Sequence, residues 1–157
     1  MKSALRFIID LALIIWLGGI FFFGAIMAHS VFQVMSVMDG GTTLAGFIVS
    51  KALYGMHSMA LICGVVILLV STLLHKKLFR IEHLLVLAML ALTCFSQFSI
   101  TPKMEAIRYS VKRMDQLAAT DDRKLEFDKL HKMSTGTEGA VFFLGLVVVW
   151  IRTAKDK

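Results

Sequence analysis

Residues 47–74 read FIVSKALYGMHSMALICGVVILLVSTLL, and this stretch decides the fold. Only Lys51 and His57 interrupt a run of apolar and small residues that is longer than the ~20 residues needed to span a membrane as a helix. Three more runs of this kind lie outward from it, over residues 7–35, 84–100 and 136–151. Open strands cannot satisfy their backbone groups in lipid, and none of the runs alternates like a barrel strand. The sequence therefore predicts four transmembrane helices.

The composition agrees with this prediction. The chain has 157 residues, of which 57% are hydrophobic and 18% charged. The dominance of apolar residues excludes a disordered chain, and the absence of a triplet repeat excludes collagen. Two cysteines are too few for a disulfide-stapled secreted module. The first run is also too long for a cleaved signal peptide. We expect an all-α integral membrane protein whose residues 1–157 form a single membrane domain, a four-helix transmembrane bundle.

The distribution of Lys and Arg predicts the orientation. The short connection 75–83 carries three basic residues, whereas the connection 36–46 carries none. The positive-inside rule then places both termini in the cytoplasm. The formal net charge of +6 is concentrated at the cytoplasmic helix ends, where anionic lipid headgroups of the bilayer are the expected partner. No alternation of aromatic and basic residues indicates a nucleic-acid partner.

Residues 101–135 form the one long polar stretch, between the third and fourth spans. Thr101 can cap a helix that begins at Pro102, and an apolar stripe follows at spacings of three and four. The stripe consists of Met104, Ile107, Val111, Met114 and Ala118. A turn with a helix N-cap at 119–122 starts a second helix. We expect an extracytoplasmic helical hairpin, whose charges form either a solvated face or a docking site for another subunit.

Polar residues inside the spans are the candidate functional residues, since they are costly in lipid and usually face the bundle or a wet cavity. Asp10 is expected to pair with Arg6, one turn away, while Lys51 either snorkels to the interface or has a function. Ser50, Tyr54 and His57 share a helix face by spacing. Five polar side chains are expected to converge in the outer half of the bundle: His29, His57, Gln97, His131 and Glu138. Each His can instead be bonded only to a neighbour.

The histidines suggest metal or haem binding. Neutral imidazole is a common metal ligand, and two His on facing helices, His57 and His131, could hold a haem iron or a transition metal. His29 is a third candidate ligand, and the candidate supporting groups are Gln97, Glu138, Lys51 and Tyr54. Met56 and Met59 flank His57, and their thioethers suit a soft metal such as copper, although Met is also common core filler. No constellation for nucleophilic catalysis is present, so a non-catalytic role is expected.

Three short motifs together resemble a known family. They are Trp16-Leu17-Gly18-Gly19-Ile20-Phe21-Phe22-Phe23-Gly24-Ala25, Ile100-Thr101-Pro102-Lys103-Met104 and Phe127-Asp128-Lys129-Leu130-His131-Lys132-Met133-Ser134. The chain resembles, over nearly its full length, the bacterial relatives of the transmembrane protein 205-like family, a four-span domain of unknown function. The resemblance implies a bacterial inner-membrane protein. His131 matches the family pattern, whereas His29 and Glu138 depart from it.

Three functions follow as hypotheses. The first is a binding protein that holds a metal ion or haem in the outer half of the bundle. The second is an accessory subunit of a larger membrane complex, which uses the hairpin or the apolar bundle surface. The third is a small transporter or channel that acts as an oligomer, disfavoured because four spans show no internal repeat for alternating access.

Overall fold

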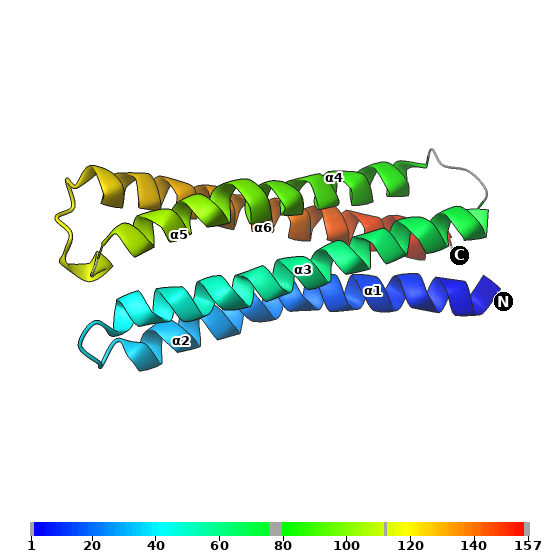
Figure 1. Ribbon diagram of the computed structural model, residues 1–157. Helices are drawn as coiled ribbons and strands as arrows, with labels where there is room; N and C mark the ends of the chain where they lie inside the picture. Colours follow the sequence, from blue (N-terminus) through cyan, green and yellow to red (C-terminus); the bar gives the residue numbers. More distant parts are fainter. Residues whose placement is uncertain (1, 76–79, 112, 156–157) are drawn as a thin grey trace.

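The computed structural model describes residues 2–75, 80–111 and 113–155, and all regular structure within these ranges is helical. The helices form four long rods, which run alongside one another (Figure 1). All four are long and apolar enough to cross a membrane, over Lys2–Met35, Gly41–Leu74, Ile81–Ser110 and Asp122–Ala154. The predicted fold class, an all-α four-helix membrane bundle, is confirmed.

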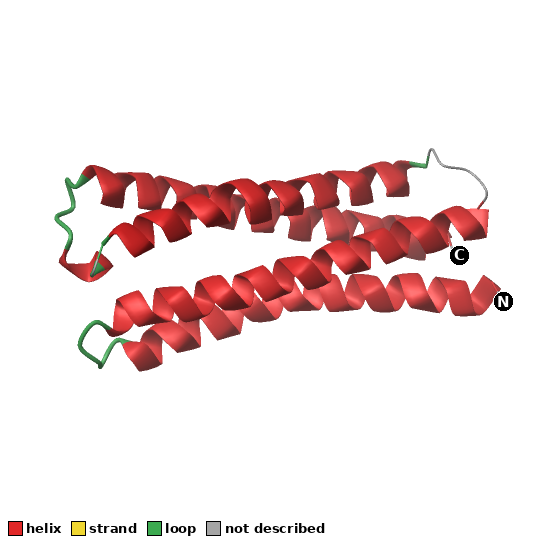
Figure 2. Ribbon diagram, viewed as in Figure 1, coloured by secondary structure: helices red, strands yellow, loops and turns green. Residues whose placement is uncertain are grey.

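Two of the four rods contain a short π-helical segment, and both stay helical throughout (Figure 2). The first rod consists of α1 (Lys2–Phe22), the π segment η1 (Phe23–Met27) and α2 (Ala28–Met35). The second is α3 (Gly41–His75). The third consists of α4 (Ile81–Phe95), the π segment η2 (Ser96–Ile100) and α5 (Thr101–Ser110). The fourth is α6 (Asp122–Lys155), preceded by the 3₁₀ turn η3 (Met114–Gln116).

The rods pair as two hairpins that pack on each other. α1 and α2 lie along α3, while α4 and α5 lie along α6 (Figure 1). Contacts of α3 with α4 and of α1 with α6 close the bundle. Both chain ends lie at one end of the bundle, and the turns that follow α2 and α5 lie at the other (Figure 1).

The half of the bundle that contains the chain ends, here called the packed half, has the main apolar core. Trp16 is almost fully buried there beside Leu13 and Met89. Two glycines allow the helices to approach closely: a Cβ at Gly64 would lie 2.9 Å from Trp16 Cζ3, and one at Gly145 would clash with the Leu17 side chain. Small residues at such contacts are typical of membrane helices, whose association depends on close packing.

The other half, here called the cleft half, has a much smaller core. Its buried apolar cluster is formed by Ile100, Met104 and Leu130, with Ile107 and Phe127 packed against it. A Cβ at Gly24 or Gly139 would meet no atom within 4 Å. The same four rods therefore pack tightly at one end and leave space at the other.

Large apolar side chains cover the outside of the bundle. Phe7, Leu73, Phe143 and Trp150 are all exposed, and Trp150 is 73% exposed. Such a surface is unfavourable in water and matches the apolar interior of a bilayer. The exposed apolar surface and the four span-length helices together define an integral membrane protein.

The polar hairpin is present, but its first arm is shorter than predicted. α5 ends at Ser110 because Val111 has an extended backbone, so the apolar stripe does not continue as a helix to Ala118. Thr101 does not cap a new helix either, because the third rod is continuous through it. Its hydroxyl instead donates to the Ser96 carbonyl at 3.0 Å. The wide π turn ends at Ile100, two residues before Pro102, which has no N–H to donate and so disfavours a regular α-turn there.

The second arm begins as predicted. Asp121 precedes α6 and its carboxylate accepts a hydrogen bond from the Arg123 backbone N–H at 2.9 Å, which is N-cap geometry. The Arg123 guanidinium also binds this carboxylate, and this hydrogen bond lowers the pKa of Asp121 to about 2.

A polar latch joins the two turns at the tip of the cleft half. Arg113 binds Asp39, which follows α2, at 2.6 Å and Asp115 at 2.7 Å. The Thr43 hydroxyl lies 3.2 Å from Asp115 Oδ1 and accepts from the Met114 N–H. The hydrogen bond from Arg113 holds the pKa of Asp115 below its usual value. Gly40, with φ of 69°, makes the turn that brings Asp39 to this latch.

Two predictions at the other end of the bundle are corrected. The segment 75–83 was expected to be a loop, but α4 begins at Ile81, and Glu82 and His83 are buried in its first turn. Part of that loop, residues 76–79, lies outside the described residues. Asp10 was expected to pair with Arg6 on its own helix, and the structure pairs it with Arg152 of α6 at 2.7 Å. Both differences arise because contacts between distant helices outweigh local spacing.

Candidate functional site

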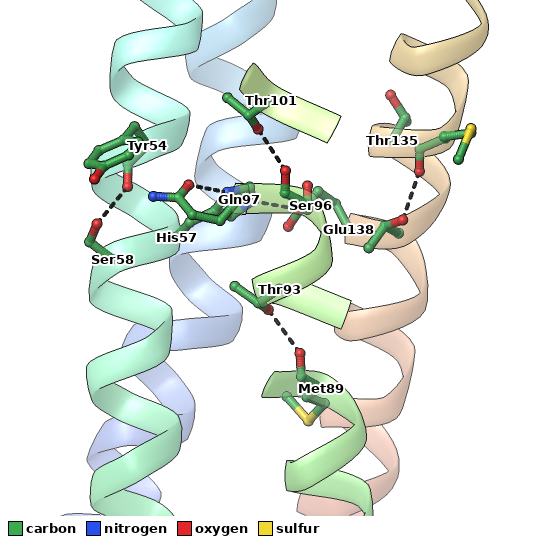
Figure 3. A network of polar contacts seen from close by, with 12 residues as sticks. Tyr54, His57, Ser58, Met89, Thr93, Ser96, Gln97, Thr101, Thr135 and Glu138 are labelled. Carbon is green, nitrogen blue, oxygen red and sulfur yellow. Dashed lines mark hydrogen bonds and ion pairs between the residues drawn. The ribbon is translucent and has the colours of Figure 1, made fainter. Parts of the chain in front are cut away.

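A buried polar triad joins three of the four rods. His57 of α3 is fully buried, with its Nδ1 2.9 Å from Gln97 Oε1 and its Nε2 2.5 Å from Glu138 Oε1 (Figure 3). Gln97 lies in η2 and Glu138 in α6. The prediction that His57, Gln97 and Glu138 converge from different helices agrees with this geometry.

The hydrogen bonds restrict where the protons of the triad lie. The Gln97 carbonyl oxygen only accepts, so His57 Nδ1 carries a proton and donates it. His57 Nε2 and Glu138 then share a second proton. The pair is either an imidazolium with a carboxylate or a neutral imidazole with a carboxylic acid. In both forms the pair has no net charge, which is the form in which a polar pair is least costly in lipid.

The π segment η2 sets the position of Gln97. A π turn inserts one extra residue into a helix and rotates the side chains beyond it, and such turns are frequent at functional sites. Here Ser96, Gln97 and Ile100 all face inward. The Thr101 N–H and hydroxyl both donate to the Ser96 carbonyl, which satisfies the widened turn (Figure 3).

A cleft of about 650 Å³ opens in the cleft half, beside the triad. All four rods line it, and Glu138 belongs both to the lining and to the triad. Its walls are mostly apolar, with Ile20, Phe23, Leu53 and Phe142 among them. Polar groups are spaced along it: His29, Ser50, Thr101, Arg108, His131, Ser134, Thr135 and Glu138. Its volume falls in the range of ~300–1,000 Å³ that is typical of small-molecule pockets.

Arg108 of α5 lines this cleft and is more buried than Glu138, the other charged residue in its lining. It is 6% exposed, and its guanidinium lies 5.5 Å from the centre of the Phe47 ring and 5.3 Å from that of Phe127. Its Nη1 has no hydrogen-bond partner among the described residues. In the sequence, Arg108 is one of many charged residues in the polar stretch 101–135. Its one sequence signal is the four-residue spacing from Met104, which places both on the buried face of α5.

The predicted metal and haem ligands do not form one cluster. Both ring nitrogens of His57 are engaged by Gln97 and Glu138. His131 is exposed and stacks on Phe127, with 6.4 Å between ring centres, and it lines the cleft together with His29. Within residues 2–75, 80–111 and 113–155, no group of three or more His, Cys, Asp or Glu side chains could hold a metal ion.

The other predicted residues of α3 divide between inside and outside. Met56 is buried and lines the cleft, and Met59 is half-buried against Gly19. Lys51 is exposed, and Tyr54 is 52% exposed, so neither lies on the bundle face with Ser50 and His57. The buried face of α3 is centred on Met56, His57 and Ala60. Tyr54 lies at the side of this face and is therefore exposed.

A second buried polar group, in the packed half, was not predicted. The Thr72 hydroxyl donates to the Leu68 carbonyl at 2.8 Å and so accepts from His83 Nε2, 3.4 Å away. Glu82 is buried beside Arg80 at 3.8 Å. This group borders a space of about 10 Å³, the size of a single water molecule. It is too small for a ligand, so the cleft is the better candidate for a binding site.

The four span-length helices and the lipid-compatible surface define a small helical membrane protein with a cleft between its helices. Residues 11–113, about two thirds of the chain, match the family described as a domain of unknown function, DUF4149. The protein belongs to this family. The match includes His57, Gln97 and Arg108 and ends before α6, which carries His131 and Glu138. The kinship with transmembrane protein 205 stays a prediction.

The other comparisons found no relative. No curated protein and no solved structure matches the chain.

Proposed function

We propose that this protein is a non-catalytic membrane protein that binds a small amphipathic molecule in the cleft between its four rods. One observation carries the proposal: a cleft of about 650 Å³ with apolar walls and separated polar groups, in a bundle that is otherwise tightly packed. A pocket with mostly apolar walls and a few polar groups is the usual form of a small-molecule site.

Two glycines of α6 provide the test. Gly139 lines the cleft, and a Cβ there would enter open space, so Gly139→Leu fills the cleft without a clash at the backbone. Gly136 also has open space around its Cβ, but it is exposed and does not line the cleft. Gly136→Leu is therefore a matched control on the same helix.

The experiment measures binding of two fluorescent probes to detergent-purified protein: cis-parinaric acid and its methyl ester. We expect at least one probe to bind the wild type and Gly136→Leu with similar affinity, and Gly139→Leu to bind it roughly tenfold more weakly or not at all. Equal binding by all three proteins, or no binding of either probe by the wild type, would overturn the proposal.

Haem remains a second candidate, because His29 and His131 come from different rods and line the same cleft. Histidine is a common ligand of haem iron, so these two side chains would be the ones to hold it. We expect an absorption spectrum of the purified protein to show a Soret band that is lost in both His29→Ala and His131→Ala. A spectrum without this band, after expression with added haem precursor, would eliminate this candidate.

A further inference from the structure

The most unusual group in the cleft is the Arg108 guanidinium. A buried cation is costly unless it is paired and hydrogen-bonded. Arg108 is 6% exposed and its Nη1 has no hydrogen-bond partner among the described residues. The ion pairs found in those residues do not include Arg108. The aromatic rings of Phe47 and Phe127 stabilise it only in part, since a cation–π contact does not replace a hydrogen bond.

Several acidic groups of the cleft half bind partners other than Arg108. Glu138 shares a proton with His57, and that pair has no net charge in either form. Asp39 and Asp115 bind Arg113, and Asp121 binds Arg123. Glu105 lies three residues before Arg108 on α5 and interacts with it electrostatically, but the ion pairs within 4 Å among the described residues do not join these two. The cleft therefore presents, at one end, a buried positive charge that is compensated only in part.

The position of the guanidinium is fixed by its surroundings. The rings of Phe47 on α3 and Phe127 on α6 lie at about the same distance from the guanidinium. Gly46 leaves room for it on the third side: a Cβ there would lie 3.0 Å from Arg108 Nε and 3.1 Å from Cζ. A guanidinium held in this way loses little conformational freedom when it binds an oxyanion.

The apolar part of the cleft extends away from Arg108. Gly46 and Met56 both line it from α3, ten residues apart, which corresponds to ~15 Å along a helix. Ile20, Leu53 and Phe142 form apolar walls. A ligand with its head at Arg108 would thus have room for a hydrocarbon chain that ends near Glu138.

We propose that the ligand is a single-chain acidic amphiphile, whose carboxylate or phosphate head binds Arg108 and whose hydrocarbon chain occupies the apolar cleft. This inference rests on the proposed function and specifies the chemical class of its ligand. The head can be the carboxylate of a fatty acid or the phosphate of a lysolipid, because both offer the oxyanion that a guanidinium recognises.

The test is displacement of bound cis-parinaric acid by four competitors: laurate, dodecyl phosphate, methyl laurate and inorganic phosphate. We expect laurate or dodecyl phosphate to displace the probe at concentrations roughly tenfold or more below those of methyl laurate, as for a lost charge-assisted hydrogen bond. The stronger competitor of the two shows whether the ligand head is a carboxylate or a phosphate. Inorganic phosphate is expected not to compete, because it has no chain to bury.

Variants of Arg108 give a second, independent measurement. Arg108→Gln is expected to weaken laurate roughly tenfold or more and to leave methyl laurate unchanged, with partial recovery in Arg108→Lys. Arg123→Gln removes an exposed arginine of α6 and serves as the charge-matched control. Gly46→Ala, which keeps the charge but displaces the guanidinium, replaces Arg108→Gln if that variant does not fold.

The outcomes separate this inference from the proposed function. If methyl laurate displaces the probe as well as laurate does, the role of Arg108 is wrong, although a cleft ligand remains. If inorganic phosphate alone displaces it, the site binds a free oxyanion and the amphiphile is wrong. If Gly139→Leu also binds as the wild type does, the proposed function fails with it.

Discussion

The packed half and the cleft half are built from the same four rods, yet the helices pack closely in the first and leave a cleft in the second. In the packed half, Gly64 and Gly145 bring helices into contact around Trp16 and Leu17. In the cleft half, Gly24 and Gly139 face open space instead. The difference shows that small residues do not by themselves predict close packing. What matters is whether a large side chain from the neighbouring helix occupies the space that the glycine leaves.

The largest expected effect is loss of the core of the packed half. Trp16→Ala should lower the free energy of unfolding by about 3–5 kcal/mol, because it leaves a cavity in the best-packed region. The measurement is thermal unfolding in detergent, in which size-exclusion chromatography gives the fraction of protein that stays folded at each temperature. Trp150→Ala is the control, since Trp150 is exposed on the bundle surface. Similar losses in both variants would show that the burial of Trp16 does not stabilise the packed half.

Next in size is the polar triad, which lies beside the cleft. Glu138→Leu should cost about 1–3 kcal/mol of unfolding free energy, because His57 Nε2 loses its partner while it stays buried. Glu138→Gln keeps a hydrogen-bonding group and should cost less. Glu126→Leu replaces an exposed acid on the same helix and should be nearly neutral. Equal effects of the Leu and Gln variants would show that the hydrogen bond does not stabilise the fold.

The two kinds of glycine give a direct comparison of the halves. Gly145→Ala should destabilise by about 1–3 kcal/mol, since its Cβ would meet the Leu17 side chain. Gly139→Ala should be neutral or stabilising by up to about 1 kcal/mol, through the higher helix propensity of Ala. Thermal unfolding of both variants measures the difference. The same sign and size of change in both would mean that the cleft closes in solution.

The smallest effect is expected at the surface of the cleft half. The pKa of Asp121 is lowered from 3.8 to about 2 by its hydrogen bond with Arg123. The stability that this contact adds is complete above pH ~4 and lost as pH falls towards 2. The melting temperature of the wild type should therefore fall slightly more over this range than that of Asp121→Asn. Parallel pH profiles would show that the contact does not contribute.

The sequence predicts the helices well because each span has its own apolar run, which needs no knowledge of its neighbours. The spacing of polar residues also identifies His57, Gln97 and Glu138, since few polar side chains occur in the spans. Arg108 escapes prediction because its burial depends on Phe47 and Phe127, which belong to other rods. The early end of α5 and the burial of His83 likewise depend on tertiary contacts. Metal, haem and protein partners stay predictions.

The wide separation of the triad residues along the chain has a consequence for biogenesis. His57 is bonded to Gln97, 40 positions away, and to Glu138, 81 positions away. During synthesis, α3 reaches the membrane before α6 exists, so neither partner is present when His57 first leaves water. α6 is the least hydrophobic of the four spans and carries Glu138. The fourth helix thus arrives last, with the group that completes the hydrogen bonding of the second.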